Sequence, residues 1–281
     1  MKKENTIIVA LAVLAAIIAS TWLLLVAPGY TGNGINMTPG VTELSEEHFD
    51  LHMIVLWVCA VIGIAVFTVM FTSIILHRKS RGHDAAKFSH STKAEIIWTI
   101  IPVLILVGMA IPATKALVKM EDFSGAEMTV KITGFQWRWK YEYLDQDISF
   151  ISSLDPNSNA ARQLNSGIVP ESVENYLLDV DHPLVLPVGR KIKFLITADD
   201  VIHSWWVPAL GWKRDAIPGF INEAWTNIEK PGTYRGQCAE LCGKDHGFMP
   251  IVVVALAQDE FDAWANEQLA KNQIDQQVTS R

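Results

Sequence analysis

The sequence predicts a membrane-anchored α+β protein in which a transmembrane helical hairpin precedes an outer β-sandwich or barrel. Half of the 281 residues are hydrophobic, and long apolar stretches gather in three runs, at residues 6–27, 53–76 and 96–118. Short β-rich segments follow the last run and are separated by Pro and Gly, the pattern of a sandwich or barrel.

Each apolar run is long enough to cross a membrane, because a helix needs roughly 20 apolar residues to span a hydrocarbon core of ~30 Å. The first run lies in residues 1–27, which begin Met-Lys-Lys and fit either a signal peptide or a first hydrophobic anchor. An intact anchor is favoured, because the run exceeds the usual signal-peptide core of about 7–15 residues and no clean A-x-A site follows it. The later two runs form the predicted transmembrane hairpin, residues 53–118.

Charge orients this hairpin. The loop predicted at residues 77–95 contains five basic residues, Arg78, Lys79, Arg81, Lys87 and Lys93. Such residues accumulate on the cytoplasmic side of a membrane, so this loop is expected in the cytoplasm. Residues 28–52, predicted as an outer linker, contain several acids and no Lys or Arg. The chain after residue 118 is therefore expected on the outer side.

The outer part divides into a β-domain, predicted at residues 119–257, and a C-terminal helix or tail at residues 258–281. Phe261, Trp264 and Leu269 recur at helical spacing in the tail. A polar stretch rich in turn formers, residues 155–175, is predicted as a long loop or insertion in the β-domain.

The outer domain contains more acidic than basic residues. A domain that binds nucleic acid needs a basic footprint, so nucleic acid is excluded as a partner. The excess acid serves either to attract a basic protein by electrostatic steering or only to keep the domain soluble.

Soft metal ligands gather in one short segment, CAELCGKDHGFMP, at residues 238–250. Its candidate ligands are Cys238, Cys242, His246 and Met249. A disulfide, a zinc site and a copper site are the competing interpretations, and disulfides persist outside the cytoplasm. The third cysteine, Cys59, lies in an apolar run, where a free Cys packs as a small hydrophobe, and it is assigned no role.

Met249 favours copper over zinc, because structural zinc sites use four Cys or His ligands, whereas blue-copper sites combine two His, one Cys and a weak axial Met. His203 supplies a candidate second His, at the end of a strand-like run, and loops at one end of a sandwich can converge. Two thiolates can bridge two copper ions. Each ion then has two sulfurs and one His, with Met249 and a backbone carbonyl as the remaining weak ligands.

Four segments closely resemble subunit II of the haem–copper cytochrome c oxidases, over roughly residues 40–265. They are KAEIIWTIIP (93–102), GFQWRWKYEY (134–143), HSWWVPALGWKRDAIPG (203–219) and CAELCGKDHGFMP (238–250). The resemblance implies a cupredoxin-like β-sandwich or barrel for the outer domain. With the Lys-Lys start and the acidic outer domain, it points to the periplasmic side of a bacterial inner membrane.

The resemblance also implies a binuclear copper centre, CuA, that accepts electrons from cytochrome c. They then pass to haem in subunit I, where oxygen is reduced to water with proton pumping. The implied copper ligands are His203, Cys238, Cys242, His246, Met249 and the backbone carbonyl of Glu240. The Glu240 carboxylate is implied to help bind a magnesium ion shared with subunit I.

Further residues receive roles from the same resemblance. Trp137 matches the surface aromatic through which electrons enter, although alternating aromatics are also typical of a buried strand face. Glu95 matches the mouth of a proton path into subunit I, although a helix dipole alone favours an acid there. Four acids match a docking surface for cytochrome c or are ordinary solvated charges: Glu142, Asp179, Asp181 and Asp200.

The sequence departs from the family pattern at Phe220, where many relatives have Arg, and at the bulky Trp206 and Trp212. No C-x-x-C-H motif occurs, so a separate cytochrome c is the expected donor. The copper domain of a nitrous oxide reductase is disfavoured by the paired spans, and a quinol oxidase subunit II by the copper ligands. An anchored, non-catalytic β-domain closed by a Cys238–Cys242 disulfide remains the alternative from another class.

Overall fold

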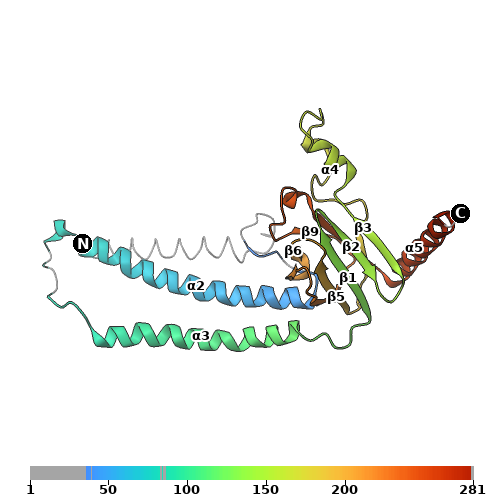
Figure 1. The fold of residues 1–281 in the computed structure, drawn as a ribbon. Coiled ribbons are helices and arrows are strands. Elements are labelled where there is room, and N and C mark those ends of the chain that lie inside the picture. The colour runs from blue at the N-terminus through green and yellow to red at the C-terminus, as the bar shows by residue number, and fades with distance from the viewer. Residues whose placement is uncertain (1–35, 39, 83, 85–86, 280–281) are drawn as a thin grey trace. The chain divides into compact units, whose positions relative to one another are not determined.

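The computed structural model describes residues 36–279 except 39, 83, 85 and 86, so the prediction for residues 1–27 falls outside the described part of the chain. The described chain forms two compact units. One contains most of two long helices, α2 (Glu43–Leu76) and α3 (Thr92–Met120), and the other contains a β-sandwich (Figure 1). The sandwich unit also includes the first turns of α2, through His48, and the end of α3, from Ala116.

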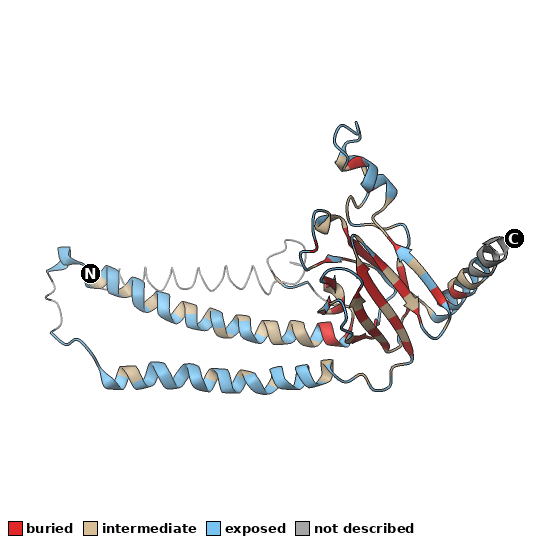
Figure 2. Ribbon diagram, in the orientation of Figure 1, coloured by how far each residue is buried: buried red, intermediate tan, exposed pale blue. Residues whose placement is uncertain are grey.

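Both long helices are apolar enough to cross a membrane. Their side chains are exposed along most of their length (Figure 2), and a helix that is apolar on every side without protein cover is suited to lipid. A short 3-10 turn, η1 (Lys79–Arg81), lies in the loop between them. Pro102 and Pro112 occur inside α3, and Pro is more frequent in transmembrane helices than in soluble ones.

The helix α2 begins at Glu43, before the predicted start of the hairpin at Met53. Thr42 and Ser45 cap it, because the amide of Ser45 donates to Thr42 Oγ1 at 3.0 Å and the amide of Thr42 donates to Ser45 Oγ at 2.9 Å. Acidic side chains in a first helical turn are favoured by the helix dipole. The acids that indicated a linker at residues 28–52 therefore begin the helix instead.

Ten strands of the described chain form two five-stranded sheets, ordered β3-β2-β1-β5-β8 and β4-β10-β9-β6-β7. Their bounds are β1 (Met128–Phe135), β2 (Arg138–Tyr143), β3 (Ile148–Ser152), β4 (Leu184–Pro187), β5 (Ile192–Ala198), β6 (His203–Val207), β7 (Trp212–Ala216), β8 (Asn222–Thr226), β9 (Gly232–Cys238) and β10 (Pro250–Leu256). β1 runs parallel to β5 and β4 parallel to β10, and the other pairs are antiparallel. The predicted fold class, an α-helical anchor with a β-sandwich, is confirmed.

Alternation along the strands builds the core between the sheets. In β2, Trp139, Tyr141 and Tyr143 are buried, and the residues between them are not, because successive side chains of a strand point to opposite faces. Trp137 precedes β2 and is only half-buried. The predicted aromatic stripe is thus core at three positions and leaves Trp137 partly accessible.

The polar stretch predicted as a loop belongs to the β3–β4 segment, residues 153–183. It contains the short helix α4 (Pro156–Ala161) and the 3-10 turn η2 (Pro170–Ser172). Asp155 caps α4 by accepting a hydrogen bond from the amide of Ser158 at 2.9 Å.

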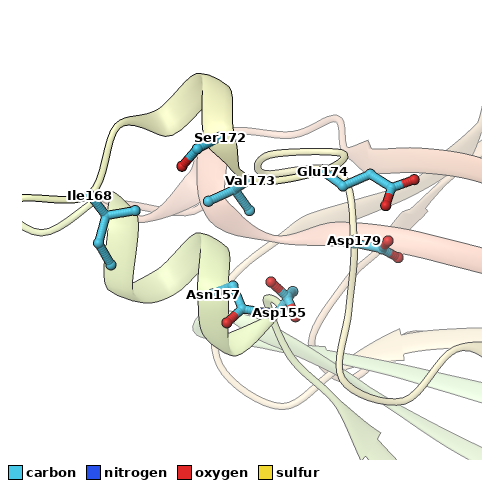
Figure 3. Close-up of a pocket in the computed structure, with 7 residues that line it drawn as sticks. All are labelled: Asp155, Asn157, Ile168, Ser172, Val173, Glu174 and Asp179. Atoms are coloured by element: carbon cyan, nitrogen blue, oxygen red, sulfur yellow. The ribbon is translucent and has the colours of Figure 1, made fainter.

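A hollow of about 420 Å³ lies within this segment. Figure 3 shows the side chains that line it, among them the acids Asp155, Glu174 and Asp179. Two of these acids already have partners in the chain. Asp155 caps α4, and Asp179 accepts from Arg235 Nη2 on β9 at 3.3 Å. The hollow therefore offers little uncommitted charge to a ligand.

After the last strand, α5 (Gln258–Thr279) packs its first turns on the sandwich. Phe261 is buried, and the ring of Trp264 lies 5.4 Å from that of Tyr143. These contacts explain the helical spacing of aromatic residues in this part of the sequence.

Candidate metal centre

Two neighbouring strands bring the first pair of candidate ligands together. His203 is the first residue of β6 and Cys238 the last residue of β9, and Trp205 lies opposite Cys238 in the antiparallel ladder. The strands approach closely at Gly236, where a Cβ atom would lie 2.0 Å from the carbonyl oxygen of Trp206. Glycine at this position therefore permits the backbone contact that sets Cys238 beside His203.

The β9–β10 loop, residues 239–249, supplies the other side chains. The amide of Cys238 donates to the carbonyl of Met249 at 3.0 Å and closes the base of the loop beside the β9–β10 ladder. The 3-10 turn η4 (His246–Phe248) returns His246 toward Cys242, and Met249 is buried.

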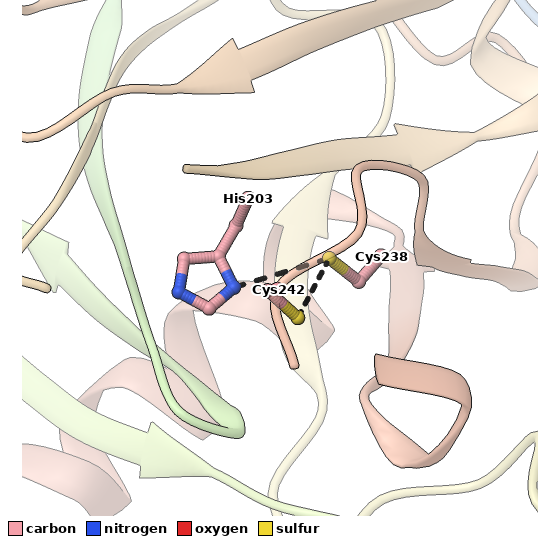
Figure 4. Close-up of side chains that lie close together, drawn as sticks. All are labelled: His203, Cys238 and Cys242. Carbon is pink, nitrogen blue, oxygen red and sulfur yellow. Dashed lines mark hydrogen bonds between the residues drawn. The ribbon is translucent and has the colours of Figure 1, made fainter. Parts of the chain in front are cut away.

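The candidate ligand atoms form a chain of close contacts, part of which is drawn in Figure 4. The Sγ of Cys238 lies 3.9 Å from His203 Nδ1 and 3.9 Å from the Sγ of Cys242. The Sγ of Cys242 lies 3.6 Å from His246 Nδ1. The thiol of Cys238 also donates to the carbonyl of Glu240 at 3.4 Å. The two sulfurs thus lie at the centre, with one imidazole beside each.

Asp200 orients the fully buried His203. Because a carboxylate only accepts, His203 Nε2 donates to Asp200 Oδ1, at 2.9 Å, and Nδ1 is left facing Cys238. Burial lowers the pKa of His203, but hydrogen bonds with Cys238 and Asp200 outweigh it and raise the pKa. Asp200 is itself fixed by the amides of Gln136, at 2.7 Å, and Val201, at 2.6 Å.

The two thiols differ in acidity. Burial raises the pKa of Cys238, but hydrogen bonds with His203 and with the backbone of Ser204 and Glu240 lower it to about 7. Burial and the neighbouring Cys238 raise the pKa of Cys242. Since the thiolate is the form that binds metals, Cys238 is prepared for metal binding near neutral pH.

Two side chains that follow β1 contact the loop from the other sheet. Trp137 Nε1 donates to the carbonyl of Cys242 at 3.2 Å, and Gln136 Nε2 donates to the same oxygen at 2.9 Å. The ammonium of Lys244 lies 5.5 Å from the centre of the Trp137 ring. The half-buried Trp137 is therefore joined by one hydrogen bond to the backbone of a candidate ligand.

The arrangement suits a metal better than a disulfide. The sulfurs of Cys238 and Cys242 are 3.9 Å apart, whereas bonded sulfurs lie ≈ 2.05 Å apart, and both cysteines are free. His203, Cys238 and Cys242 have ligand atoms within 4.8 Å of one another, in the part of the chain that the structure describes. Thiolate and imidazole ligands suit copper and zinc.

The remaining predicted residues differ in their relation to this cluster. Glu240 contacts Cys238 through its carbonyl and is an exposed residue, and Glu95 lies in the first turn of α3, in the unit without the sandwich. Glu142 pairs with Lys131 and Lys140. The other three predicted docking acids also accept hydrogen bonds within the chain: Asp179 from Arg235, Asp181 from the amide of Ser153, and Asp200 from His203.

The sequence prediction missed two contacts. Asp200 was predicted as a docking acid, yet it orients His203, and its position three residues before that histidine was the available signal. Gln136 received no role, because its contact with Cys242 joins residues far apart in the sequence.

The three residues that depart from the family pattern, Trp206, Trp212 and Phe220, lie either in the core or at the surface. Trp212 is buried, with its ring 5.2 Å from that of Trp205, so its bulk belongs to the core. Trp206 and Phe220 are exposed. None of the three belongs to the ligand cluster.

Two family models match this chain, one in each of its two parts. The family model for the cytochrome c oxidase subunit II periplasmic domain matches residues 128–256, and the model for the transmembrane domain of the same subunit matches residues 31–116. A structure of the periplasmic domain of subunit II from Bradyrhizobium japonicum is 39% identical, with a TM-score of 0.46, over 52% of this chain and 96% of that chain.

Full-length relatives are similar across most of their sequences. The probable cytochrome c oxidase subunit 2 of Rickettsia bellii is 40% identical over 237 residues, which cover 84% of this chain and 83% of the relative. The cytochrome c oxidase subunit 2 of Cereibacter sphaeroides is 34% identical over 253 residues, which cover 85% and 80%. With the fold and the cysteine–histidine cluster, these matches show that the chain belongs to the cytochrome c oxidase subunit II family, the electron-entry subunit of haem–copper oxidases.

Proposed function

We propose that the β9–β10 loop and His203 hold the binuclear CuA centre of a cytochrome c oxidase, on the periplasmic side of a bacterial inner membrane. The proposed ligands are His203, Cys238, Cys242, His246, Met249 and the carbonyl of Glu240. The observation that carries the proposal is the pair of central sulfurs, 3.9 Å apart, with an imidazole Nδ1 within 3.9 Å of each. When bound, the copper pair stores and releases one electron.

The chain's own residues supply the route and the scaffold. Trp137 is partly accessible and donates to the carbonyl of Cys242, so one hydrogen bond and the Cys242 residue connect it to a proposed bridging sulfur. A cytochrome c that docks over Trp137 is the proposed donor, and haem in subunit I the proposed acceptor. Asp200 holds His203 in the tautomer that turns Nδ1 toward Cys238.

Two further roles complete the proposal. The exposed carboxylate of Glu240 is a proposed ligand of a magnesium ion shared with subunit I. Glu95 lies in the first turn of α3, which we assign to the cytoplasmic side, and it is the proposed entrance of a proton path into subunit I.

Copper analysis of the full chain, purified with its oxidase partners, tests the proposal. The wild type should bind a pair of copper ions with a mixed-valence spectrum, and Cys238→Ser should lose it because a bridging sulfur is gone. Cys59→Ser removes the thiol outside the cluster and should leave copper unchanged. A wild-type protein that shows no free loop thiols before reduction, and stays copper-free even after reduction and copper addition, would favour the disulfide alternative.

Electron entry has a separate test. Trp137→Phe keeps an aromatic ring but removes the hydrogen bond to Cys242, so reduction by cytochrome c should slow while the copper spectrum is retained. Trp206→Phe, at an exposed Trp on β6, is the matched control and should keep the wild-type rate. Equal rates in all three proteins would contradict the assigned role of Trp137.

A further inference from the structure

We infer that Arg162, in the β3–β4 segment, is a positioning residue that holds the β9–β10 loop in its metal-binding conformation. The inference rests on the proposed CuA function. Arg162 follows α4, far from the loop in sequence, and it meets the loop on both sides of His246.

Arg162 holds the loop through two contacts, which we call the Arg162 contacts. Arg162 Nη1 donates to Asp245 Oδ1 at 3.2 Å, and the guanidinium carbon lies 4.4 Å from the centre of the Phe248 ring. A third bond aims the side chain, because Arg162 Nε donates to Asn159 Oδ1 in α4 at 2.8 Å. The Arg162 and Asp245 side chains are each about four-fifths buried, with relative exposures of 21% and 20%, so water screens the pair less than it screens a surface pair.

The contacted residues flank proposed ligands. Asp245 immediately precedes His246, and Phe248 immediately precedes Met249. Within the loop, the amide of His246 donates to Gly243 O and that of Phe248 to Asp245 O. Those bonds shape the turn but do not attach it to the rest of the sandwich. The contacts of Arg162 provide such an attachment.

Arginine is suited to this position in a way that lysine is not. Its planar guanidinium can donate to a carboxylate at its edge while its face lies on an aromatic ring. A lysine would keep the positive charge for Asp245 but lose the planar stacking on Phe248. The variant Arg162→Lys therefore separates the effect of the positive charge from the effect of the planar guanidinium group.

The Arg162 contacts lie near the residue that is proposed for electron entry. Arg162, Asp245 and Phe248 border a hollow of about 340 Å³ whose wall also includes Gln136 and Trp137. The β3–β4 segment, the loop and the proposed entry residue thus meet around one space. Release of Arg162 is expected to loosen the loop on the side that faces Trp137.

A matched control exists at the other end of the same segment. Arg235 on β9 donates to Asp179 at 3.3 Å and ties the segment to the sandwich. Arg235→Met should loosen the β3–β4 segment without removing a contact of the β9–β10 loop. Any effect that Arg162→Met shows and Arg235→Met lacks then belongs to the loop.

The first measurement uses the full chain in detergent, free of copper, in a Cys59→Ala background so that only Cys238 and Cys242 react. We expect Arg162→Met to raise the rate of thiol labelling by about tenfold, Arg162→Lys to fall between, and Arg235→Met to match the wild type. Copper-loaded oxidase should then lose copper to a chelator about 10–100-fold faster in Arg162→Met, the range found for residues that support metal ligands.

Charge alone is separated from positioning by the Arg162→Met/Asp245→Asn double variant. Each single change leaves one uncompensated charge beside the copper, so the reduction potential should fall in Arg162→Met and rise in Asp245→Asn, and it should return toward the wild type in the double variant. Thiol labelling should remain fast in the double variant, because the Arg162 contacts are still absent.

Two results would overturn the inference: a wild-type labelling rate in Arg162→Met, or recovery of slow labelling in the double variant. A wild type that binds no copper would instead refute the proposed function, and the labelling rates would still test the Arg162 contacts.

Discussion

The buried His203 donates from Nε2 to Oδ1 of the partly exposed Asp200 at 2.9 Å, which leaves the histidine Nδ1 facing Cys238. Asp200→Asn should weaken this arrangement, because an amide NH2 can donate to Nε2 and favour the tautomer with its proton on Nδ1. We expect copper affinity to fall by roughly 10–100-fold, as for other residues that support metal-binding histidines.

Competition with a copper chelator would measure this loss in the purified oxidase. Asp199→Asn changes the adjacent acid, whose side chain takes no part in the His203 bond, and is the control. Equal copper affinity for Asp200→Asn and Asp199→Asn would show that the carboxylate does not orient His203.

Gly134→Ala should disturb the same histidine by steric contact. A Cβ atom at Gly134 would lie 3.0 Å from Trp139 Cζ3 and 3.1 Å from the His203 ring. The overpacked core should lose roughly 1–3 kcal/mol of unfolding free energy, and the copper absorption spectrum should shift. Gly247→Ala, where a Cβ would meet nothing within 4 Å, should change neither property. Thermal denaturation and absorption spectra of the two variants give the comparison.

Glu142 provides a test in pH. Burial raises the pKa of this carboxyl, but hydrogen bonds with Lys140 and Lys131 outweigh it and hold the pKa below its usual value. A lowered folded-state pKa stabilises the fold above the unfolded value of about 4.3, and the contribution is lost as the pH falls through the lowered pKa. Glu142→Gln should therefore lower the free energy of unfolding by up to about 1 kcal/mol at pH 7. It should leave that free energy unchanged at a pH below the lowered pKa of Glu142.

The measurement is the midpoint of thermal unfolding of the wild type and of Glu142→Gln, from pH 7 down to a pH below the lowered pKa of Glu142. Glu171→Gln, at an exposed acid in η2, should follow the wild type at every pH. A difference for Glu142→Gln that stays constant down to the lowest pH would contradict the assigned ion pairs.

Glu95→Ala tests the proton path. Loss of the carboxylate at the start of α3 should slow proton uptake by the assembled oxidase and leave its copper content unchanged. Glu46→Ala removes an acid from the first turn of the other long helix and should leave proton uptake intact. Turnover and proton uptake in reconstituted vesicles distinguish the variants, and wild-type turnover in Glu95→Ala would reject the role.

The sequence predicted the helices well where hydropathy alone decides, and less well at their ends. Residues 53–76 are apolar enough to identify a span, but the acids from Glu43 onward suggested a linker. They are helical because Thr42 and Ser45 cap the helix and a helix N-terminus favours acids. A cap of two small hydroxyl residues is a weak signal beside a run of charge.

The candidate site was predictable where its residues share one loop and less so where strands from different sheets meet. The spacing of Cys238, Cys242 and His246 is visible in the sequence, and His203 was found by ligand count. Gln136 and Arg162 reach the loop only through the folded topology. Their roles depend on the register of the sheets and on the path of the β3–β4 segment, which spacing does not encode.

The cap of α2 has a practical consequence for anyone who prepares the copper domain as a water-soluble fragment. Thr42 donates to the carbonyl of Leu210 at 3.0 Å, the amide of Val41 to that of Ala209 at 3.0 Å, and His48 bonds to the carbonyl of Gly211 at 2.7 Å. A fragment that begins at the end of α3 would lack the groups that now bond to these three consecutive carbonyls. It would also expose the surface against which Leu44 is buried. We therefore expect a fragment that includes residues 40–48 to be more stable than one without them, because it keeps these contacts at the junction of β6 and β7.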